Sequence, residues 1–571
     1  MSEEITKRIA QVFPYDGKQE ITIAIGVPAP MATGSANLGY QILWNELNQL
    51  PGVYAGLFFL DSDPTTLIGT DKQISDSDAI IFSYSFEPMF LDAIQMLRRA
   101  NVPEFSEKIE ESLEDRLSIK GILTLEKRRK NDSPLVIGGG LGVANVEPFA
   151  PFIDAAVYGA AEGFGEELVQ VLRQEKTTKD RIKIMSDLQG VYIPSEYKDT
   201  GMLGEDYRIQ RVGNVPQVIM PRVHQQDPKG SLLGKPLFLI SEDPNKLKEG
   251  DNLAYLEIVR TCEHQCGYCA IGGDKKDQCS VDPKIARKEI EELVAAGADF
   301  VRLVFPSSIN PDYTLDLFTE LDGLPFRAGS LRADDLLPES IELIAKTGQM
   351  KVSFAPETNE KLRRGEGKRL LDTQILDAVY WSGFHGIPYI QLDSLLGVEG
   401  ETNETLEQYA MFLDNCQLKL ESGRVDGGHR IDGEEGRIIV NINQLYNRPG
   451  TRRMHLPQMG FHEATRRYGH LINSSKNERM LWNSELVNNS SMSIWQPVFA
   501  KGGRELAEFA YNLSFKDRSN WGISEWEQEI RKSELDPNTY FIGTSPEKHP
   551  SAHVRPISAM TRQHTRLFEN D

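Results

Sequence analysis

The chain has 571 residues, of which 40% are hydrophobic and 26% charged, so it needs more than one hydrophobic core and we expect about three domains. Its formal net charge of −21 repels phosphate backbones and argues against bulk nucleic-acid binding. Its longest apolar runs have only the length of strands and its first residues contain no signal-peptide segment, so we expect no membrane span.

Residues 20–175 alternate between strand-like and helix-like segments. Continuous apolar runs such as "EITIAIGVP" and "SPLVIGGG" are typical of buried parallel strands, and "MFLDAIQMLRRA" has the spacing of an amphipathic helix. We therefore predict a doubly wound, Rossmann-like α/β domain over residues 1–195, with about five strands. The charged stretch 104–132 is interpreted as a solvated helix pair or a lid.

A connection and two further regions follow. Residues 196–250 are rich in Pro, Gly and Asp, which indicates an irregular interdomain connection with a few short strands. Residues 251–445 repeat strand then helix six times, which predicts a partial (β/α)6 barrel whose chemistry lies at the C-terminal ends of its strands. Residues 446–571 look mainly helical and more polar, and they end in a non-periodic stretch that we interpret as a mobile tail.

Three of the five cysteines, Cys262, Cys266 and Cys269, lie close together directly after the first predicted barrel strand. So few cysteines in so long a chain form no disulfide framework and indicate a reduced, cytoplasmic protein. A zinc site would need a second, separated pair of ligands, and a redox C-x2-C pair would leave Cys262 unexplained. An iron–sulfur cluster fits better, because thiolates hold such clusters and three of them leave one iron open, as in catalytic metal sites.

With an aromatic residue before its third cysteine and a place after the first strand of a βα barrel, this C-x3-C-x2-C loop resembles the radical S-adenosylmethionine (SAM) superfamily. The resemblance implies that the cysteines hold one 4Fe–4S cluster and that its open iron binds the amino and carboxylate groups of SAM. One electron then cleaves the sulfonium, and the resulting 5′-deoxyadenosyl radical removes a substrate hydrogen. A reductant such as flavodoxin or ferredoxin is the implied partner.

The same resemblance assigns roles to residues at other strand ends. Tyr268 is expected to back the adenine of SAM. Further candidates for SAM contacts follow the second, third and fourth strands: Ser307, Ser308, Ser330, Arg332 and Glu357. The two serines after the second strand replace the Gly-Gly-Glu stretch of the family, from which this sequence departs. Each polar residue alone also fits surface or helix-cap chemistry, but their coincidence at successive strand ends favours a functional interpretation.

The N-terminal half resembles the cobalamin-binding domain that is fused to many radical SAM enzymes, through "GSANLGYQILWNELNQLPGVYA", "DAIIFSYSFEP" and "PLVIGGGLGVANVEP". The resemblance implies that one serine-tyrosine loop faces the cofactor and that a glycine loop lets the backbone approach its nucleotide tail. These candidates are Ser83, Tyr84, Ser85, Gly138, Gly139, Gly140 and Gly142. The alternative is that the glycines only form tight turns. Because His224 is the first histidine, we expect the lower cobalt face to be empty, watered or met by a non-histidine group.

The remaining cysteines limit the alternatives. Methylthiolating relatives carry a cysteine triad in an N-terminal domain, whereas no cysteine precedes Cys262 here, and only Cys279 and Cys416 follow the loop, so we expect a single cluster. Cys416 is expected to be a buried small hydrophobe and Cys279 a rim residue. The main hypothesis is cobalamin-dependent methyl transfer to an unactivated carbon of a small-molecule or peptide substrate. The alternatives are a cyclisation or rearrangement with a first domain that only positions substrate, and an iron–sulfur electron carrier or sensor.

Overall fold

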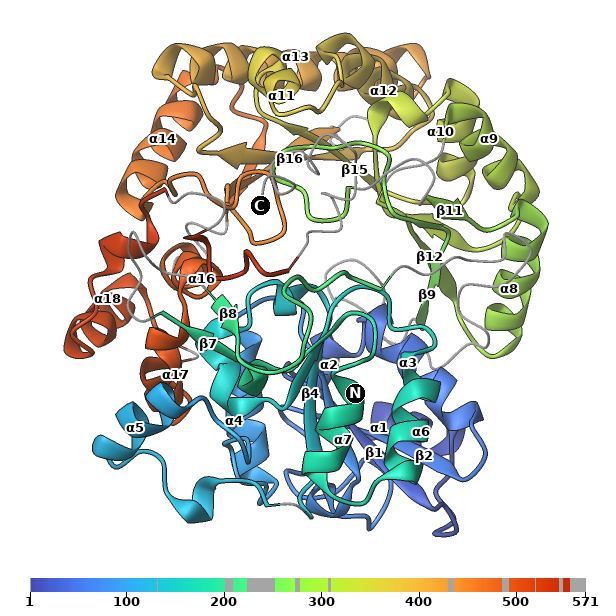
Figure 1. The fold of residues 1–571 in the computed structure, drawn as a ribbon. Coiled ribbons are helices and arrows are strands. Elements are labelled where there is room, and N and C mark those ends of the chain that lie inside the picture. The colour runs from blue at the N-terminus through green and yellow to red at the C-terminus, as the bar shows by residue number, and fades with distance from the viewer. Residues whose placement is uncertain are drawn as a thin grey trace.

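The computed structural model describes residues 2–130, 132–200, 209–222, 252–272, 278–306, 310–429, 436–484, 492–518, 520–543 and 548–554. These residues form an N-terminal α/β unit, a curved parallel barrel and a set of C-terminal helices, so the predicted fold class is confirmed (Figure 1). No helix of the described residues combines the length and the apolar composition that a membrane crossing needs.

The first unit is built on one sheet of six strands in the order β2-β1-β3-β4-β5-β6. Neighbouring strands are parallel from β2 to β5, and β6 is antiparallel to β5. The strands are β1 (Ile21–Val27), β2 (Val53–Phe59), β3 (Ala79–Ser83), β4 (Leu135–Gly139), β5 (Ala155–Val157) and β6 (Val191–Tyr192). Every residue of β1 and β2 is buried, because helices cover both faces of the sheet.

Helices of the first unit divide between the two faces of its sheet. One face packs against α1 (Ser2–Val12), α3 (Leu38–Gln49), α6 (Phe164–Gln174) and α7 (Thr178–Met185). The other face packs against α4 (Met89–Arg99). The short helix α2 (Met31–Gly34) follows β1. Because β1, β3, β4 and β5 are parallel, the loops that follow these strands all begin at the same edge of the sheet.

The segment 104–132 differs from the predicted solvated helix pair. It holds one α-helix, α5 (Glu111–Ile119), whose Leu113 and Leu117 side chains are buried. The Arg129 guanidinium is fully buried and donates to both oxygens of Asp154 at 3.0 and 3.2 Å. Part of the charge of this segment is therefore buried. The buried Arg129 is paired with Asp154, which lies outside the segment.

The barrel consists of parallel strands in two adjoining sheets, β13-β12-β9 and β14-β15-β16-β17-β18. The strands are β9 (Leu253–Glu257), β12 (Phe300–Val304), β13 (Phe326–Ala328), β14 (Ser330–Leu331), β15 (Lys351–Glu357), β16 (Tyr389–Leu396), β17 (Arg437–Gln444) and β18 (Leu481–Ser484). Only Gly329 separates β13 from β14, so the two form one barrel strand. Strand β18 lies beyond residue 445 and adds one strand to the six βα units that the sequence predicts.

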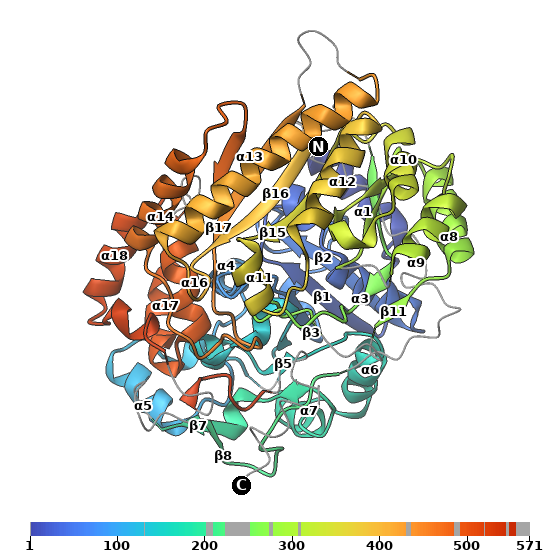
Figure 2. The same ribbon diagram turned by 90° about the horizontal axis from the view of Figure 1, so that it is seen from above.

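The helices of the barrel lie outside its arc of strands, and the concave side of the arc faces the first unit (Figures 1 and 2). They are α8 (Pro283–Ala295), α9 (Pro311–Glu320), α10 (Pro338–Lys346), α11 (Glu360–Gly365), α12 (Asp372–Phe384), α13 (Asn403–Asp426) and α14 (Phe461–Ser474). Along β16 and β17, buried apolar residues alternate with partly exposed ones. The buried residues pack against the helices, so the alternate residues point into the barrel.

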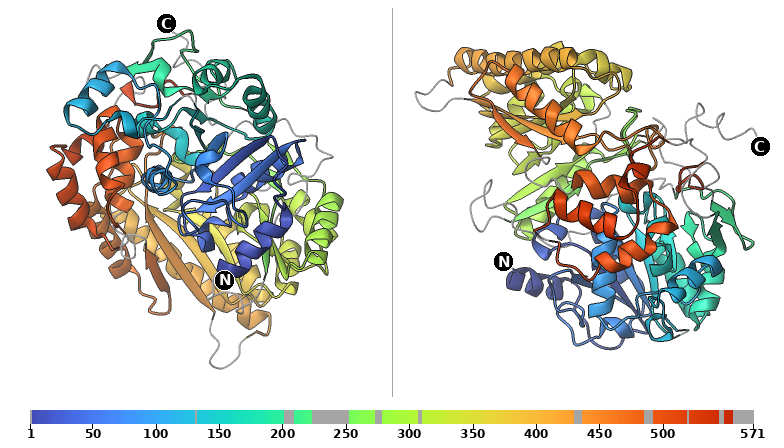
Figure 3. Two further views of the ribbon diagram at one scale, coloured as in Figure 1. Left: turned by 90° about the horizontal axis from the view of Figure 1, so that it is seen from below. Right: turned by 90° about the vertical axis from the view of Figure 1, so that its left-hand side faces the viewer.

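The C-terminal helices pack against the first unit. They are α16 (Met492–Lys501), α17 (Ala507–Leu513) and α18 (Ile523–Lys532), drawn in red between the two units in the right-hand view of Figure 3. Phe499 packs on Phe149 with ring centroids 5.1 Å apart, and Arg504 pairs with the buried Glu147 at 2.8 Å.

Part of the predicted tail is also packed. His549 and His553 are buried, and Val554 forms a β-bridge with Ile219. Residues 548–554 are therefore packed and do not form a mobile arm, whereas residues 544–547 and 555–571 lie outside the described residues. In the predicted connection, the short antiparallel strands β7 (Tyr197–Asp199) and β8 (Ile209–Arg211) are present, and residues 223–250 are not described.

Candidate functional site

The three-cysteine loop lies at the carboxyl end of the first barrel strand, directly after the short strand β10 (Val259–Arg260). Cys262 is buried, and Cys266 and Cys269 are partly buried. The Cys269 amide donates to the Cys266 carbonyl at 3.1 Å, so the loop turns back on itself. In the part of the chain that the structure describes, no group of three His, Cys, Asp or Glu side chains stands in metal-binding positions.

Two other segments of the barrel hold this loop through its backbone. The Gly267 amide donates to the Glu366 carbonyl at 2.7 Å, and the Arg452 guanidinium donates to the Gln265 carbonyl at 2.7 Å. The Glu366 carboxylate pairs with Arg453, which ties the two segments together. A Cβ atom on Gly267 would lie only 2.5 Å from a Glu366 carboxylate oxygen. A larger residue at position 267 would therefore require the Glu366 carboxylate to shift, which would disturb its pair with Arg453.

Positive charges lie beside Cys266. Burial raises the pKa of the Cys266 thiol to about 11, and the Lys368 ammonium and Arg332 guanidinium act in the opposite direction. Burial, followed by the charge of Glu357, raises the pKa of the Tyr268 hydroxyl. Lys368 donates to Glu357 at 2.7 Å, and both side chains are buried. The environment therefore combines low solvent access with cations that favour a thiolate.

Two non-glycine residues beside the loop have left-handed backbone conformations. Thr261, which precedes the first cysteine, has a φ of 66°, and Glu357, at the end of β15, has a φ of 63°. Such residues are uncommon and cost free energy unless the surrounding structure holds them. Strain of this kind concentrates at functional sites, and here it lies directly before Cys262 and at Glu357, whose charge acts on Tyr268 and Cys266.

The donor set of this loop fits an iron–sulfur cluster. Thiolates are the ligands that hold such clusters, and the chain places three of them on one short loop. A partly buried thiol with a raised pKa, such as Cys266, keeps its proton until a metal replaces it. Cys262, Cys266 and Cys269 are the residues that would hold the cluster.

The structure brings some of the predicted SAM residues together near this loop. Arg332 is buried, pairs with Asp334 at 2.7 Å and is close enough to Cys266 for its charge to lower the pKa of that thiol. Glu357 lies close enough to Tyr268 for its charge to raise the pKa of the Tyr268 hydroxyl. Ser330 is exposed in β14 and lines a cavity inside the barrel. Ser307 and Ser308 lie outside the described residues.

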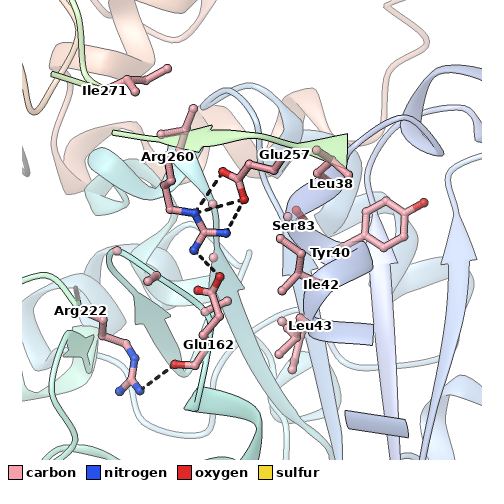
Figure 4. Close-up of a pocket in the computed structure, with 18 of the residues that line it drawn as sticks. Leu38, Tyr40, Ile42, Leu43, Ser83, Glu162, Arg222, Glu257, Arg260 and Ile271 are labelled. Atoms are coloured by element: carbon pink, nitrogen blue, oxygen red, sulfur yellow. Dashed lines mark hydrogen bonds and ion pairs between the residues drawn. The ribbon is translucent and has the colours of Figure 1, made fainter. Parts of the chain in front are cut away.

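A pocket of about 350 Å³, which we call the slot, lies between the first unit and the cysteine loop (Figure 4). Its walls are mostly apolar side chains from β1, α3 and β3, and glycine backbone closes one side. The loop that carries the cysteines supplies the opposite wall. The lining includes Ile25, Leu38, Ile42, Leu43, Ile81, Ser83, Gly139, Gly140, Thr261, Ala270 and Ile271. The slot thus occupies the carboxyl end of a parallel sheet, where such sheets bind ligands.

Ion pairs close the rim of the slot. Arg260, two residues before Cys262, donates to Glu257 at 3.0 Å and also pairs with Glu162 of the first unit (Figure 4). Arg222 donates to the Glu162 carbonyl at 3.5 Å. Arg260 therefore connects the strand before the cysteine loop to the first unit across the opening of the slot.

The candidates of the first unit divide into slot residues and packing residues. Ser83, Gly139 and Gly140 line the slot. Ser85 lies nearby, where its hydroxyl accepts from the Asn37 amide at 3.1 Å. Tyr84 was expected to face the cofactor, but its ring is buried in the core and stacks on Phe90 at 3.7 Å between centroids.

The glycine loop shows the same division. A Cβ atom at Gly139 would meet no other heavy atom within 4 Å, so its backbone opens onto the slot. A Cβ atom at Gly142 would lie 2.8 Å from Tyr84, and one at Gly138 would lie 3.0 Å from the Tyr84 ring. Gly138 and Gly142 are therefore needed for packing against the loop after β3, in line with the tight-turn alternative.

Sequence reasoning missed the charged residues that support the site. Lys368, Glu366 and Arg260 are not in the cysteine motif, and their partners come from other strands or from the first unit. The only signal was their place in the charged stretch "LRRGEGKRLL", which begins in α11, after β15, and in "EIVRTC", directly before the first cysteine. Arg and Lys are so common on surfaces that this signal alone does not single them out.

The chain is similar to several known proteins. Over 443 residues it is 22% identical to "Uncharacterized protein MJ0966" of Methanocaldococcus jannaschii, a match that spans 75% of this chain and 78% of that protein. It is 23% identical over 214 residues to the ribosomal protein uS12 methylthiotransferase RimO of Trichormus variabilis, or 35% of this chain and 44% of RimO. The chain is also similar in structure to the radical S-adenosylmethionine methyltransferase TsrM from Kitasatospora setae, solved with cobalamin and a 4Fe–4S cluster bound. That match covers 74% of this chain and 72% of the TsrM chain, at 14% identity and a TM-score of 0.45.

A family model matches part of the first unit. Residues 106–194 match the family described as "Radical SAM proteins, N-terminal". The matched segment contains β4, β5 and the glycines that line the slot. The first unit is thus similar to the N-terminal part of radical SAM proteins, and the three-cysteine loop lies at the end of the first barrel strand.

Proposed function

We propose that the chain holds one 4Fe–4S cluster on Cys262, Cys266 and Cys269, cleaves SAM reductively, and binds a cobalamin at the carboxyl end of the first sheet. The reaction that we propose is methyl transfer to an unactivated carbon of a small-molecule or peptide substrate. One observation carries this proposal: Thr261 and Ile271, on either side of the cysteines, form a wall of the slot, so the two candidate cofactor sites share a boundary.

At the cysteine loop, the residues of the chain hold and shield the cluster. When bound, the cluster supplies the electron that cleaves the sulfonium of SAM, and we propose flavodoxin or ferredoxin as its reductant. The three cysteines give up their protons on binding, which the neighbouring Lys368 and Arg332 favour at Cys266. The Glu366 carbonyl accepts from the Gly267 amide and the Arg452 guanidinium donates to the Gln265 carbonyl, and these hydrogen bonds keep the loop in place.

At the slot, the residues of the chain favour a flat apolar group. When bound, cobalamin supplies the methyl group. The side chains of Ile25, Leu43 and Ile81 exclude water, and the bare backbone at Gly139 permits close approach of a ring such as the base of the nucleotide tail. The Ser85 carbonyl accepts from the Arg448 guanidinium at 3.5 Å, which places a polar, non-histidine group at the same end of the sheet.

The size of the slot favours one alternative function. A volume of about 350 Å³ lies at the lower end of the range for small-molecule sites. A first unit that holds only a small substrate would need no more space. In that case the chain would still be a radical SAM enzyme, but turnover would not depend on cobalamin, and the outcome would be a cyclisation or rearrangement.

The test uses the full chain, expressed with cobalamin available and purified without oxygen. The proposal predicts that SAM and a strong reductant give 5′-deoxyadenosine, that omission of the reductant gives none, and that cobalt stays with the protein. Product without cobalt would favour the alternative in which the first unit positions substrate. Iron without any 5′-deoxyadenosine would contradict SAM cleavage and favour an electron carrier or sensor.

A further inference from the structure

The glycine loop that lines the slot is held at its far end by a residue outside the predicted site. Gly139, Gly140 and Leu141 line the slot. Leu141 begins a short 3₁₀ helix, Leu141–Ala144, and Asn145 follows this helix directly. The Asn145 side chain is completely buried. Its position therefore determines where the short helix that begins in the slot wall ends.

Asn145 fixes this end through hydrogen bonds to the C-terminal region. Its amide group donates to the carbonyls of Phe499 at 3.0 Å, Ala500 at 3.1 Å and Gly502 at 2.8 Å. These carbonyls lie at the end of α16, where the last carbonyl groups of a helix have no partners within the helix. The Asn145 oxygen accepts from the Glu147 amide at 3.3 Å. One side chain thus joins the glycine loop to the end of α16, and both of its polar atoms are used.

The end of α16 contacts the barrel as well as the first unit. The ion pair between Arg504 and Glu147, at 2.8 Å, attaches the same two segments two residues beyond Asn145 and Gly502. On the barrel side, the buried Lys501 ammonium donates to the Leu456 carbonyl, in the segment between β17 and α14. The end of α16 therefore lies between the glycine loop and the barrel, as the place of α16 in Figure 1 shows.

We propose that Asn145 is a positioning residue for the ligand of the slot. Its hydrogen bonds to the end of α16 hold the glycine loop in the conformation that binds the ligand. The C-terminal region thereby sets the affinity of a pocket that it does not line, because none of the described residues beyond Ile271 belongs to the slot. The identity of the ligand as cobalamin rests on the proposed function, whereas the ordering of the glycine loop by Asn145 does not.

The expected effect follows from the cost of ordering a loop on binding. A loop that is already ordered binds its ligand more tightly than one that must be ordered by the ligand. Without the Asn145 amide, the carbonyls at the end of α16 lose their donor in a buried place, and the glycine loop is no longer attached to them. If the loop then adopts the binding conformation in about a tenth of the molecules, the affinity falls about tenfold.

The experiment compares Asn145→Ala with the wild type in the full-length, iron-loaded protein. Equilibrium dialysis measures cobalamin affinity, and amide hydrogen exchange without cobalamin measures the order of the glycine loop. Asn145→Ala should bind cobalamin about tenfold more weakly or less, exchange faster at residues 139–144 and keep its iron. Asn145→Ser, which keeps one donor on a shorter side chain, should fall between the two proteins, and it takes the place of Asn145→Ala if that variant does not fold.

Asn48→Ala is the matched control in the same unit. The Asn48 amide donates to the Trp44 and Ala55 carbonyls at 2.8 and 3.0 Å, and its oxygen accepts from the Ala55 amide at 3.0 Å. The control therefore loses a similar set of hydrogen bonds, but neither partner of Asn48 lines the slot. Both variants should unfold at a lower temperature than the wild type. Only the change at Asn145 should alter cobalamin affinity and exchange at residues 139–144.

Three results would overturn the proposal: unchanged exchange at residues 139–144 in the Asn145 variants, cobalamin affinity equal to that of the wild type, or an equal loss of affinity in Asn48→Ala. The last result would mean that the affinity follows general destabilisation. If the wild type binds no cobalamin, the proposed cofactor fails, and hydrogen exchange alone decides the role of Asn145. If cobalamin binds equally well to all variants, the proposed cofactor stands and the role of Asn145 fails.

Discussion

The cysteine loop and the slot lie side by side at the carboxyl ends of parallel strands, but their chemistry is opposite. Charged residues surround the cysteines, among them the buried pair of Lys368 and Glu357. The slot has apolar walls such as Ile25 and Ile81, and its ion pairs lie only at the rim. The comparison teaches that the fold sets the location of both sites, whereas the side chains determine what each can hold.

The largest effect is expected from the cysteines themselves. Cys266→Ala removes one of three thiolates, so we predict loss of nearly all bound iron and of 5′-deoxyadenosine formation. Cys416→Ala is the matched control, because Cys416 is a fully buried thiol in α13 that contacts neither site. Iron and SAM cleavage are measured on both proteins. Normal iron content in the Cys266 variant would contradict the role of the loop.

Filling the slot should separate the two sites. Gly139→Leu places a side chain in the slot without a backbone clash, so we predict at least tenfold weaker cobalamin binding with unchanged iron content. Gly469→Leu on α14 also has open space around its Cβ and serves as the control. Cobalamin affinity is measured from its visible absorbance after equilibrium dialysis. If both variants bind cobalamin equally well, the slot is not its site.

Breaking the buried ion pair beside the cysteines should destabilise the barrel. Lys368→Met leaves the Glu357 carboxylate buried without its partner, which costs about 3 kcal/mol. The double variant Glu357→Gln with Lys368→Met should recover much of this loss, because no unpaired charge remains. Lys346→Met, which removes an exposed ammonium on α10, is the control. Thermal unfolding compares the four proteins, and equal midpoints for Lys368→Met and Lys346→Met would refute this account.

The rim of the slot should matter less. The Arg260 side chain and its partner Glu162 are about a fifth exposed, so solvent weakens their pairing. We predict that Arg260→Gln lowers cobalamin affinity only a few-fold, well below the effect of Gly139→Leu. The same dialysis measurement checks this order. An effect as large as that of Gly139→Leu would mean that the rim, rather than the apolar wall, provides the binding free energy.

The smallest effect concerns pH. Burial raises the pKa of Glu46, in α3 beside the rim, to about 7, with the Gly163 amide opposing the shift and Glu162 adding to it. The folded state therefore binds this proton more tightly than the unfolded state, and the stability due to it is lost as pH rises through about 7. Glu46→Gln should raise the unfolding temperature by about 1–2 °C at pH 8 and not at pH 4. A gain of equal size at both pH values would exclude this carboxyl as the cause.

Several features could be predicted because local residues determine them. The apolar runs of β1 and β2 require burial on both faces, and this requirement predicts a parallel sheet. The spacing of the three cysteines, with its place after the first barrel strand, predicts the site for a cluster. In both cases the signal lies within a few consecutive residues.

Other features depend on residues that are distant in the sequence. Arg260 pairs with Glu162 across 98 positions, and nothing near either residue indicates the other. The Tyr84 ring turned into the core although Ser83 and Ser85, on either side of it, lie at the ligand end, because Phe90 offers a stacking partner. The many charges of residues 104–132 predicted exposure to solvent, yet Arg129 is buried and forms an ion pair with Asp154. Tertiary partners decided each of these outcomes.

The central claim is that the cysteine loop and the slot serve two different cofactors in one chain. Elemental analysis for iron, cobalt and zinc tests it on a single anaerobically purified sample that was expressed with cobalamin available. The account predicts about four iron atoms and about one cobalt atom per chain, with no zinc. Zinc without iron would contradict the interpretation of the three cysteines, and iron without cobalt would contradict that of the slot.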